Sequence, residues 1–493
     1  MTGHTWAILA VFLLYLAFMV VVGALFYRRS ESVSDYFLGD RKLGKWVTAL
    51  SAQASGMSGW LLLGLPGAAY VSGLSSSWIA IGLIAGTYLN WRIVAKRLRN
   101  YTGASESIIT LSDYLEYRFR DRTRSLRIIS ALFILVFFVL YVSSGVVAGG
   151  KLFSTVFPFP YSIALVVTAL VVVSYTFLGG FNAVCWTDFI QGTLMFFAIL
   201  IVPAVALMAV GGPGAVAATL SDAEPDFFRL IHMNQGATGV AVFVGVVSSL
   251  AWGLGYFGQP HILVRFMAIR SADNVRDARI IAMVWVVLAL IGAVAVGMIG
   301  RAYLPEVLEG PDTERVFILT VDRMFPALVG GVLLAAILAA IMSTADSQLL
   351  VATSAITEDF YKGLLRRDAA ERELVWASRL TVVGVAVVAL ALAFSAERSV
   401  LKLVALAWGG FGASFGPTLI LSLFWKRMTW QGAVAGIVVG GLTVLGWHRL
   451  EGGLFDLYEI VPGFAFSSAA IVIASLASAP PSAEILDEFD TIA

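Results

Sequence analysis

Apolar blocks of roughly 20 residues recur along the whole chain, and each block is long enough to cross a bilayer core about 30 Å thick as a helix. In lipid, every backbone polar group must find its partner inside the protein, so helices are the expected element for segments of this length. Only 13% of the 493 residues are charged, whereas a soluble domain carries about 25%. The sequence therefore predicts an all-α integral membrane protein.

Thirteen transmembrane helices are expected, and they form a single membrane domain over residues 1–493. Their predicted limits are 6–27, 46–72, 75–94, 128–150, 162–181, 186–210, 238–260, 280–300, 326–357, 375–395, 400–425, 432–447 and 460–478. Helix 6–27 precedes two core sets at 46–210 and 238–425, accessory helices occupy 432–478, and a short tail follows at 479–493.

The orientation follows from the basic residues, since connections rich in Lys and Arg stay in the cytoplasm. Most of the 33 basic residues fall after the first, third, seventh, ninth and eleventh predicted helices. Arg265 is counted among them, in the connection after the seventh helix. The N-terminus is therefore expected outside and the C-terminus in the cytoplasm. The outward connections 211–237 and 301–325 are candidates for short surface helices.

Two predicted spans carry helix breakers at membrane depth. Residues 50–67 read "LSAQASGMSGWLLLGLPG", and residues 251–262 read "AWGLGYFGQPHI". Each span opens a set of five helices, so the second set enters the membrane from the opposite side. A matched pair of Gly/Pro-interrupted spans is typical of transporters built from inverted repeats, in which the breaks bind an ion and a solute. The alternative is that the glycines only allow close helix packing.

Polar residues at depth point to a cation. In "AAIMSTADSQLL", Ser343, Asp346 and Ser347 are spaced to share one helix face. An ionisable residue inside a span, here Asp346, indicates a functional site, although a hydrogen-bonded packing cluster is the alternative. Asp188, in "CWTDFIQG", is either a second such residue or a helix cap.

Several other functional classes find no support in the sequence. Cys185 is the single cysteine, and the histidines form no HExxH pair, so we expect no resident metal or other cofactor. No nucleic-acid partner is expected, although the net charge of +1 says nothing about one. The absence of a phosphate-binding loop argues against an ATP-driven pump. Isolated aspartates do not make a membrane-embedded enzyme, and a sensor would need a signalling domain. Gly432, Gly436 and Gly440 indicate close helix packing, or else a homo-oligomer face.

Segments from about residue 35 to 470 resemble the sodium/solute symporter family, in its proline branch. The matching segments are "TALSAQASGMSGWLLLGLPGAAY", "SSWIAIGL", "RIISALFIL", "WGLGYFGQPHIL", "ILAAIMSTADSQLL", "SAITEDFY" and "YEIVPGF". The resemblance implies a leucine-transporter-like fold with a 5+5 inverted repeat. It also implies alternating access, with uptake of L-proline across the cytoplasmic (inner) membrane driven by inward Na+ flow.

The resemblance also implies the residues of three sites. A central sodium would be held by backbone oxygens of Ala54, Met57 and Ala340 and by the hydroxyls of Ser343 and Thr344. A second sodium, bound by some members deeper toward the cytoplasm, would match Asp188, Ser343, Asp346 and Ser347. The proline pocket would be lined by Ser58, Trp60, Tyr141, Trp252, Tyr256 and Pro260.

Position 56 departs from the family pattern. The proline branch usually reads S-D-M-S-G-W at the first break, and Gly56 stands here in place of the acidic residue. Asp346, one turn below the hydroxyl pair, is a candidate for supplying the missing charge. A proton-coupled transporter that uses Asp346 or Asp188 remains an alternative. So does a symporter of the same fold for another solute, such as pantothenate or a sugar acid.

Overall fold

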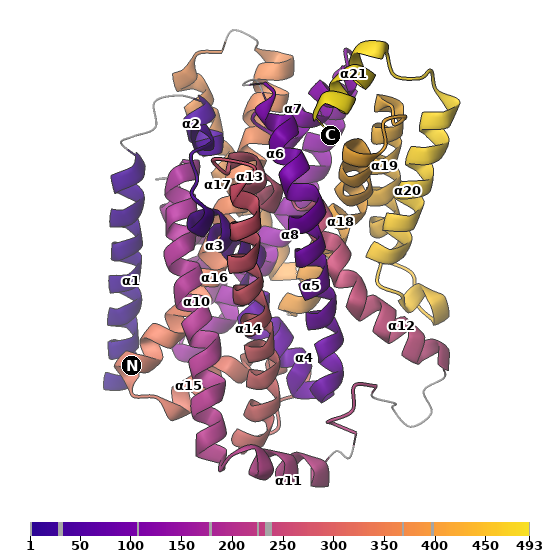
Figure 1. Cartoon of the computed structure of the whole chain (residues 1–493). Coiled ribbons are helices and arrows are strands. Elements are labelled where there is room, and N and C mark those ends of the chain that lie inside the picture. Colours follow the sequence, from indigo (N-terminus) through magenta and orange to yellow (C-terminus); the bar gives the residue numbers. More distant parts are fainter. Residues whose placement is uncertain are drawn as a thin grey trace.

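The computed structural model describes residues 2–27, 33–105, 108–176, 180–223, 226–231, 239–366, 369–395 and 399–492. Within these ranges the chain is helical, and its one β-bridge joins Leu43 to Ile269. The helices run along an elongated bundle, with the N-terminus at one end and the C-terminus at the other (Figure 1). The odd number of predicted membrane crossings leads to the same expectation.

Eleven helical runs among the described residues are long and apolar enough to cross a membrane. These runs are Gly3–Leu25, Trp60–Gly103, Ser125–Val156, Phe181–Val210, Gly239–Gly258, Asn274–Tyr303, Ala327–Tyr361, Trp376–Ser395, Val400–Phe424, Trp430–Trp447 and Ile460–Ala477. The run Trp60–Gly103 holds part of predicted helix 46–72 and all of predicted helix 75–94, and predicted helix 162–181 corresponds to the shorter apolar helix Tyr161–Ser174. The merged run and the shorter helix explain why eleven runs are found where thirteen helices were predicted.

Outside the two broken segments, the helices agree with the predicted limits to within a few residues. The long helices are α1 (Gly3–Tyr27), α5 (Ser77–Leu89), α8 (Ser125–Val156), α9 (Tyr161–Thr176), α10 (Phe181–Val210), α14 (Asn274–Tyr303), α16 (Ala327–Ser354), α17 (Glu371–Ser395), α18 (Val400–Phe424), α19 (Trp430–Trp447) and α20 (Ile460–Ala477). The shorter elements are α2 (Val33–Leu38), η1 (Gly39–Arg41), η4 (Asn90–Val94), α6 (Ala95–Gly103), α7 (Leu111–Phe119), α11 (Pro213–Ala223), η6 (Gly310–Arg315), α15 (Val316–Met324), η7 (Ala355–Leu365), η8 (Gly453–Asp456) and α21 (Ala483–Ile492).

The first predicted break lies at Met57 and Ser58. The segment consists of α3 (Lys45–Gly56), a π-helical turn η2 (Trp60–Gly64) and α4 (Leu65–Ser72). Met57 leaves helical geometry with φ −107° and ψ 70°, so α3 ends there. Because the last turn of a helix lacks partners for its carbonyl groups, the break exposes backbone oxygen atoms in the middle of the bundle.

The chain reverses after α4 at Gly73, which begins the 3-10 turn η3 (Gly73–Ser76). Gly73 has φ +57°, in the left-handed region that glycine tolerates. A Cβ atom at this position would lie 2.1 Å from the carbonyl oxygen of Phe227. Only glycine can make the turn in this surrounding.

The second predicted break lies between α12 (Gly239–Leu250) and α13 (Pro260–Ala268). The 3-10 segment η5 (Ala251–Gly258) connects them, and Gln259 is extended with ψ 105°. A Cβ atom at Gly255 would lie 1.8 Å from Nε1 of Trp408, so the backbone of η5 approaches α18 as closely as only glycine allows.

The broken segments lie among α8, α10, α14, α16 and α18, while α1 lies on one flank of the bundle and α19 and α20 on the other (Figure 1). The glycines of α19 pack inside the chain. A Cβ atom at Gly432 would lie 2.0 Å from Ser475 Oγ of α20, and one at Gly440 would lie 2.3 Å from the carbonyl oxygen of Ala413 in α18. The close-packing interpretation of the GxxxG run therefore accounts for these glycines.

Candidate substrate and cation sites

A cluster of oxygen atoms lies where the end of α3 meets α16. The Ser343 hydroxyl donates to the carbonyl oxygen of Ala54 across 3.0 Å and lies 3.3 Å from that of Ala340. Thr344 Oγ1 lies 3.5 Å from the same Ala54 oxygen. All four residues are at most 3% exposed. Carbonyl and hydroxyl oxygens are the ligands that small hard cations prefer, so these residues fit sodium chemically.

Met57 is the fifth residue that the resemblance implied for a central sodium site. It is fully buried and immediately follows α3, where its N–H donates to the carbonyl oxygen of Gln53 across 2.9 Å. The structure thus places Met57 at the break, two residues beyond the last turn's Ser55 and three beyond Ala54.

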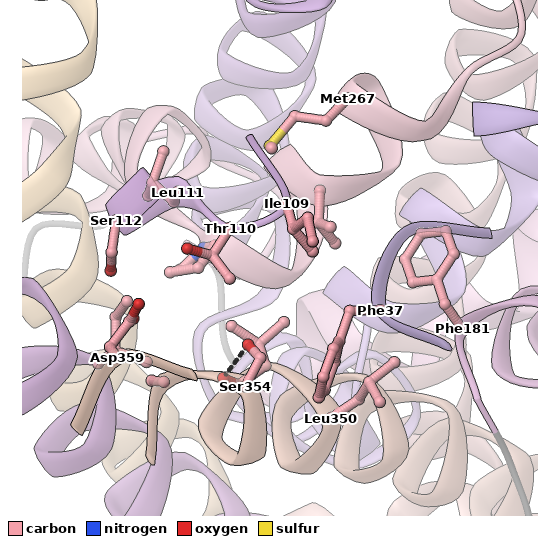
Figure 2. A pocket seen from close by; sticks show the side chains of 15 residues that line it. Phe37, Ile109, Thr110, Leu111, Ser112, Phe181, Met267, Leu350, Ser354 and Asp359 are labelled. Atoms are coloured by element: carbon pink, nitrogen blue, oxygen red, sulfur yellow. Dashed lines mark hydrogen bonds between the residues drawn. The ribbon is translucent and has the colours of Figure 1, made fainter. Parts of the chain in front are cut away.

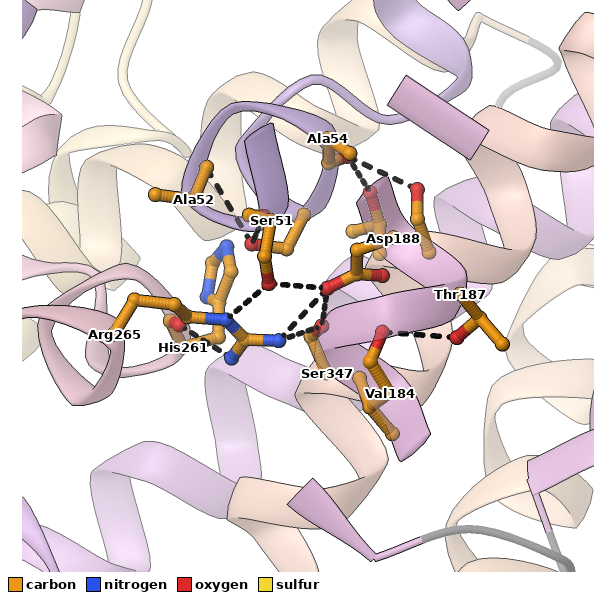
Figure 3. Close-up of polar contacts among 12 residues, drawn as sticks. Ser51, Ala52, Ala54, Val184, Thr187, Asp188, His261, Arg265 and Ser347 are labelled. Atoms are coloured by element: carbon orange, nitrogen blue, oxygen red, sulfur yellow. Dashed lines mark hydrogen bonds and ion pairs between the residues drawn. The ribbon is translucent and has the colours of Figure 1, made fainter. Parts of the chain in front are cut away.

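Asp188 and Arg265 form an ion pair inside the bundle (Figure 3). Arg265 Nη2 lies 3.0 Å from Asp188 Oδ2, and neither side chain is exposed. Ser51 Oγ donates to the same oxygen across 2.7 Å and accepts from Arg265 Nε across 3.0 Å. Ser347 Oγ lies 2.5 Å from Arg265 Nη2 and 3.5 Å from Asp188 Oδ2. Side chains from α3, α10, α13 and α16 therefore meet at one point.

This arrangement corrects two interpretations of the sequence. Arg265 does not belong to a cytoplasmic connection; it lies in α13 and is fully buried, whereas Arg270 after the helix is exposed. Asp188 is not a helix cap, because the N-cap residue of α10 is Gly180. The sequence feature that could have indicated the burial of Arg265 is its position as a single arginine in the largely apolar run that follows the second break.

Asp346 forms its hydrogen bond with a different helix from those that Asp188 contacts. Its Oδ1 accepts a hydrogen bond from Thr176 Oγ1 of α9 across 2.7 Å. Asp346 also lines a cavity with Thr353 of α16 and Arg379 of α17. The spacing of Ser343, Asp346 and Ser347 predicted that their side chains share one helix face. In the structure, however, Ser343 contacts α3 and Asp346 contacts α9. Ser347 contacts the Asp188–Arg265 pair. Of the residues implied for a second sodium, the structure brings Asp188 and Ser347 together, whereas the hydrogen bonds of Ser343 and Asp346 go to α3 and α9.

The six residues implied for the solute pocket are all buried beside the two breaks. They are Ser58, Trp60, Tyr141, Trp252, Tyr256 and Pro260. The ring centroids of Trp60 and Trp252 are 6.0 Å apart, and Trp252 lies 5.5 Å from Tyr458. The Tyr256 ring meets Trp408 edge-on at 4.9 Å. The breaks thus bring aromatic side chains from both core sets together.

Several polar atoms in this region have no hydrogen-bond partner among the described residues. They are Oγ of Ser58, the hydroxyls of Tyr141 and Tyr256, and both ring nitrogens of His261. His261 was not predicted; its ring lies edge-on to Tyr141 with centroids 6.1 Å apart. Buried polar groups without partners are costly, and a polar ligand would satisfy them.

A small cavity touches this region at Pro260. Pro260 and Val264 of α13 line it, as do Ser112 at the start of α7 and Asp359 of η7. Figure 2 shows Ser112 and Asp359 at one side of the cavity and Phe181 at the other. Ile109, Thr110 and Leu111, which lead into α7, also line the cavity.

Comparisons with known proteins agree with this architecture. The chain matches the model of the sodium:solute symporter family over residues 36–440. The sodium/proline symporter of Escherichia coli (strain K12) is 49% identical, over 98% of this chain and 95% of its own length. The high-affinity proline transporter PutP of Bacillus subtilis (strain 168) is 48% identical, over 96% of this chain and 98% of its own.

One solved structure has the same fold as this chain. A Na+-coupled sialic acid symporter in a substrate-bound, outward-open state matches with a TM-score of 0.79 and 22% identity, over 97% of this chain and 99% of that chain. The predicted leucine-transporter-like, all-α membrane fold is thereby confirmed. On the family model and the identity of its relatives, this chain belongs to the sodium:solute symporter family.

Proposed function

We propose that this protein is a secondary active transporter that couples inward sodium flow to the uptake of L-proline by alternating access. The observation that carries the proposal is the contact of Ser343 and Thr344 with the Ala54 carbonyl, directly beside an aromatic pocket. The names of the relatives at 48–49% identity support the same solute and ion.

Sodium suits the oxygen cluster for an electrostatic reason. The C-terminal end of a helix carries a partial negative charge, and α3 ends next to Ala54. Transporters of this architecture use such unwound helix ends and carbonyls to hold the coupling ion. Hydroxyl oxygens of Ser343 and Thr344 would add neutral ligands, so the site needs no carboxylate of its own.

Proline suits the pocket for a complementary reason. The Trp60, Trp252 and Tyr256 rings offer apolar surface of the size that covers a pyrrolidine ring. The unpartnered hydroxyls of Ser58 and Tyr141 offer hydrogen bonds to the polar end of a zwitterion. A solute that forms hydrogen bonds with these groups would offset the cost of burying them without partners.

Alternating access would proceed through core sets 46–210 and 238–425, each of which begins with a broken helix. The cavity that touches Pro260 supports a path toward the end of the bundle at which α6 and α7 lie. Basic residues concentrate in the connections at that end, which supports a cytoplasmic assignment. The N-terminus would then lie outside and the C-terminus in the cytoplasm, in the inner membrane of a bacterial cell.

The test is uptake of labelled L-proline by the purified full-length chain in proteoliposomes. We expect accumulation with an inward sodium gradient and none with potassium in its place. Excess unlabelled proline should abolish the signal, while pantothenate and sialic acid should leave it unchanged. Full uptake on a proton gradient without sodium would instead favour the proton-coupled reading, in which Asp346 or Asp188 carries the proton. Competition by another solute would reassign the substrate.

A further inference from the structure

The guanidinium of Arg265 lies against oxygen atoms of Asp188, Ser51 and Ser347 (Figure 3). Three of its hydrogen bonds, at 2.5–3.0 Å, go to these side-chain oxygens. The fourth goes from Nη1 to the carbonyl oxygen of His261 across 2.7 Å. All five residues are 0% exposed. Four of the five N–H donors of the guanidinium are thus directed at fixed acceptors of the protein.

The three side chains around the guanidinium are those of a cation site. One carboxylate and two hydroxyls, supplied by three different helices, form an oxygen set for a small hard cation. A sodium ion added to this set would place a second positive charge beside one carboxylate in a buried region. Because Asp188 offsets only one charge, the second would remain uncompensated, and an unpaired buried charge is strongly unfavourable. With Arg265 in place, the set does not fit sodium.

We infer that Arg265 is a built-in cation that replaces a second sodium, so that a single sodium ion accompanies each solute molecule. The inference rests on the proposed function and adds to it the residue that excludes a second sodium ion. Arg265 acts on ion stoichiometry because it neutralises Asp188 permanently, whereas a bound ion would neutralise it only while bound.

The position of Arg265 explains why the replacement can persist. Arg265 follows the second break, in α13, and its partners Ser51 and Asp188 belong to α3 and α10 of the first core set. A cation fixed to the chain cannot dissociate into the cytoplasm with the solute. It therefore contributes a structural link between the two core sets and no transported charge.

The number of sodium sites can be counted directly. We would measure equilibrium binding of radioactive sodium to the purified full-length chain, and the zero-flux coupling ratio in proteoliposomes. The wild type should bind one sodium per chain. Arg265→Gln frees the Asp188 oxygen set and should bind two, with a steeper sodium dependence and a coupling ratio that doubles. Arg118→Gln, which removes a buried arginine that donates to the Ser422 carbonyl, is the matched control and should bind one.

Loss of Arg265 alone leaves a buried carboxylate unpaired, and the variant can fail to fold for that reason. The double variant Arg265→Gln/Asp188→Asn removes both charges and should bind one sodium. Two sodium sites in the wild type or in the double variant would overturn the inference, as would one site in a folded Arg265→Gln protein. A wild type that binds one sodium without transporting proline contradicts the proposed solute alone; a wild type that binds none overturns both.

Discussion

The hydroxyl of Ser343 donates a hydrogen bond to the carbonyl oxygen of Ala54 across 3.0 Å, although 289 residues separate them in the sequence. Ala54 lies in the last turn of α3, where carbonyl groups have no partner in the next turn. The Ser343 hydroxyl therefore satisfies a carbonyl oxygen that the helix break leaves without an intrahelical partner. A sodium ion at this point would take the carbonyl oxygen as a ligand and turn the hydroxyl into a second one.

Ser343→Ala and Thr344→Ala should each raise the sodium concentration required for half-maximal proline uptake. Loss of one ligand should weaken sodium binding by about tenfold, or about 1.4 kcal/mol. Maximal uptake at saturating sodium should change less. Ser130→Ala is the control, since Ser130 is equally buried and its hydroxyl makes no hydrogen bond to any described residue. If sodium dependence is the same in all three variants, the ion binds elsewhere.

Trp252→Ala and Tyr256→Ala should each weaken proline binding without preventing membrane insertion. Each change removes one aromatic wall of the pocket, which should cost about 1–3 kcal/mol of binding free energy. Competition binding at saturating sodium measures the effect. Trp447→Ala, at a half-buried tryptophan that packs on Phe455, should leave proline affinity at the wild-type value. Unchanged affinity in both pocket variants would place the solute in another part of the bundle.

The positions of the helices and of both breaks could be predicted because they depend on local composition. Apolar length fixes the spans, and Gly, Pro and polar residues inside them mark the breaks at Met57 and Gln259. The spacing of residues along α16 was less informative. A helix that is buried on all sides contacts different neighbours within one turn, so Ser343 reaches α3 while Asp346 reaches Thr176 of α9.

The Asp188–Arg265 pair could not be predicted, because it depends on the path of the chain after the second break. A charge next to a predicted span is ordinarily counted with the loop, but α13 turns back into the protein and buries Arg265. The short helix α7 was also missed, although its start carries a recognisable signal. Thr110 and Asp113 form a capping box in the structure, and their spacing is visible in the sequence.

Lys151 and Glu314 form a second buried ion pair, on the side of the bundle away from α6 and α7. Lys151 Nζ lies 2.6 Å from Glu314 Oε2, and the side chains are 3% and 6% exposed. The Glu314 carboxylate also accepts from the N–H groups of Val400 and Leu401 at the start of α18. Glu314→Gln should therefore lower thermal stability in detergent, since breaking a buried pair typically costs about 3–5 kcal/mol.

The Lys151–Glu314 pair offers an internal check on that explanation. Lys151→Met should be similarly destabilising, but Lys151→Met/Glu314→Gln should lose less than the sum of the single changes, because no unpaired charge remains. Fluorescence-monitored thermal unfolding of the purified variants gives the comparison. Strictly additive losses would mean that Glu314 stabilises the fold only by capping α18.

Gly56 occupies the position at which the proline branch usually has an acidic residue. A Cβ atom here would lie 2.9 Å from Cδ1 of Ile262 and 4.0 Å from Cε1 of Tyr256. The close atom is the end of a flexible side chain, so a modest shift of Ile262 would admit a larger residue. Gly56→Asp should increase sodium affinity. Gly56→Asn, which has the same shape without the charge, should not.

The size of the Gly56→Asp effect follows from two opposing contributions. Unit charges about 4 Å apart attract by about 4 kcal/mol at an effective dielectric near 20. Desolvation of the new carboxylate removes much of this gain, leaving about a tenfold increase in sodium affinity.

If Asp346 replaced the missing charge, Asp346→Asn would be much milder in the Gly56→Asp background. Because Asp346 accepts from Thr176 on α9, we expect the two changes to be additive instead. A double-mutant cycle on sodium-dependent proline binding decides between these outcomes, and a coupling energy above about 0.5 kcal/mol would show that Asp346 compensates for Gly56.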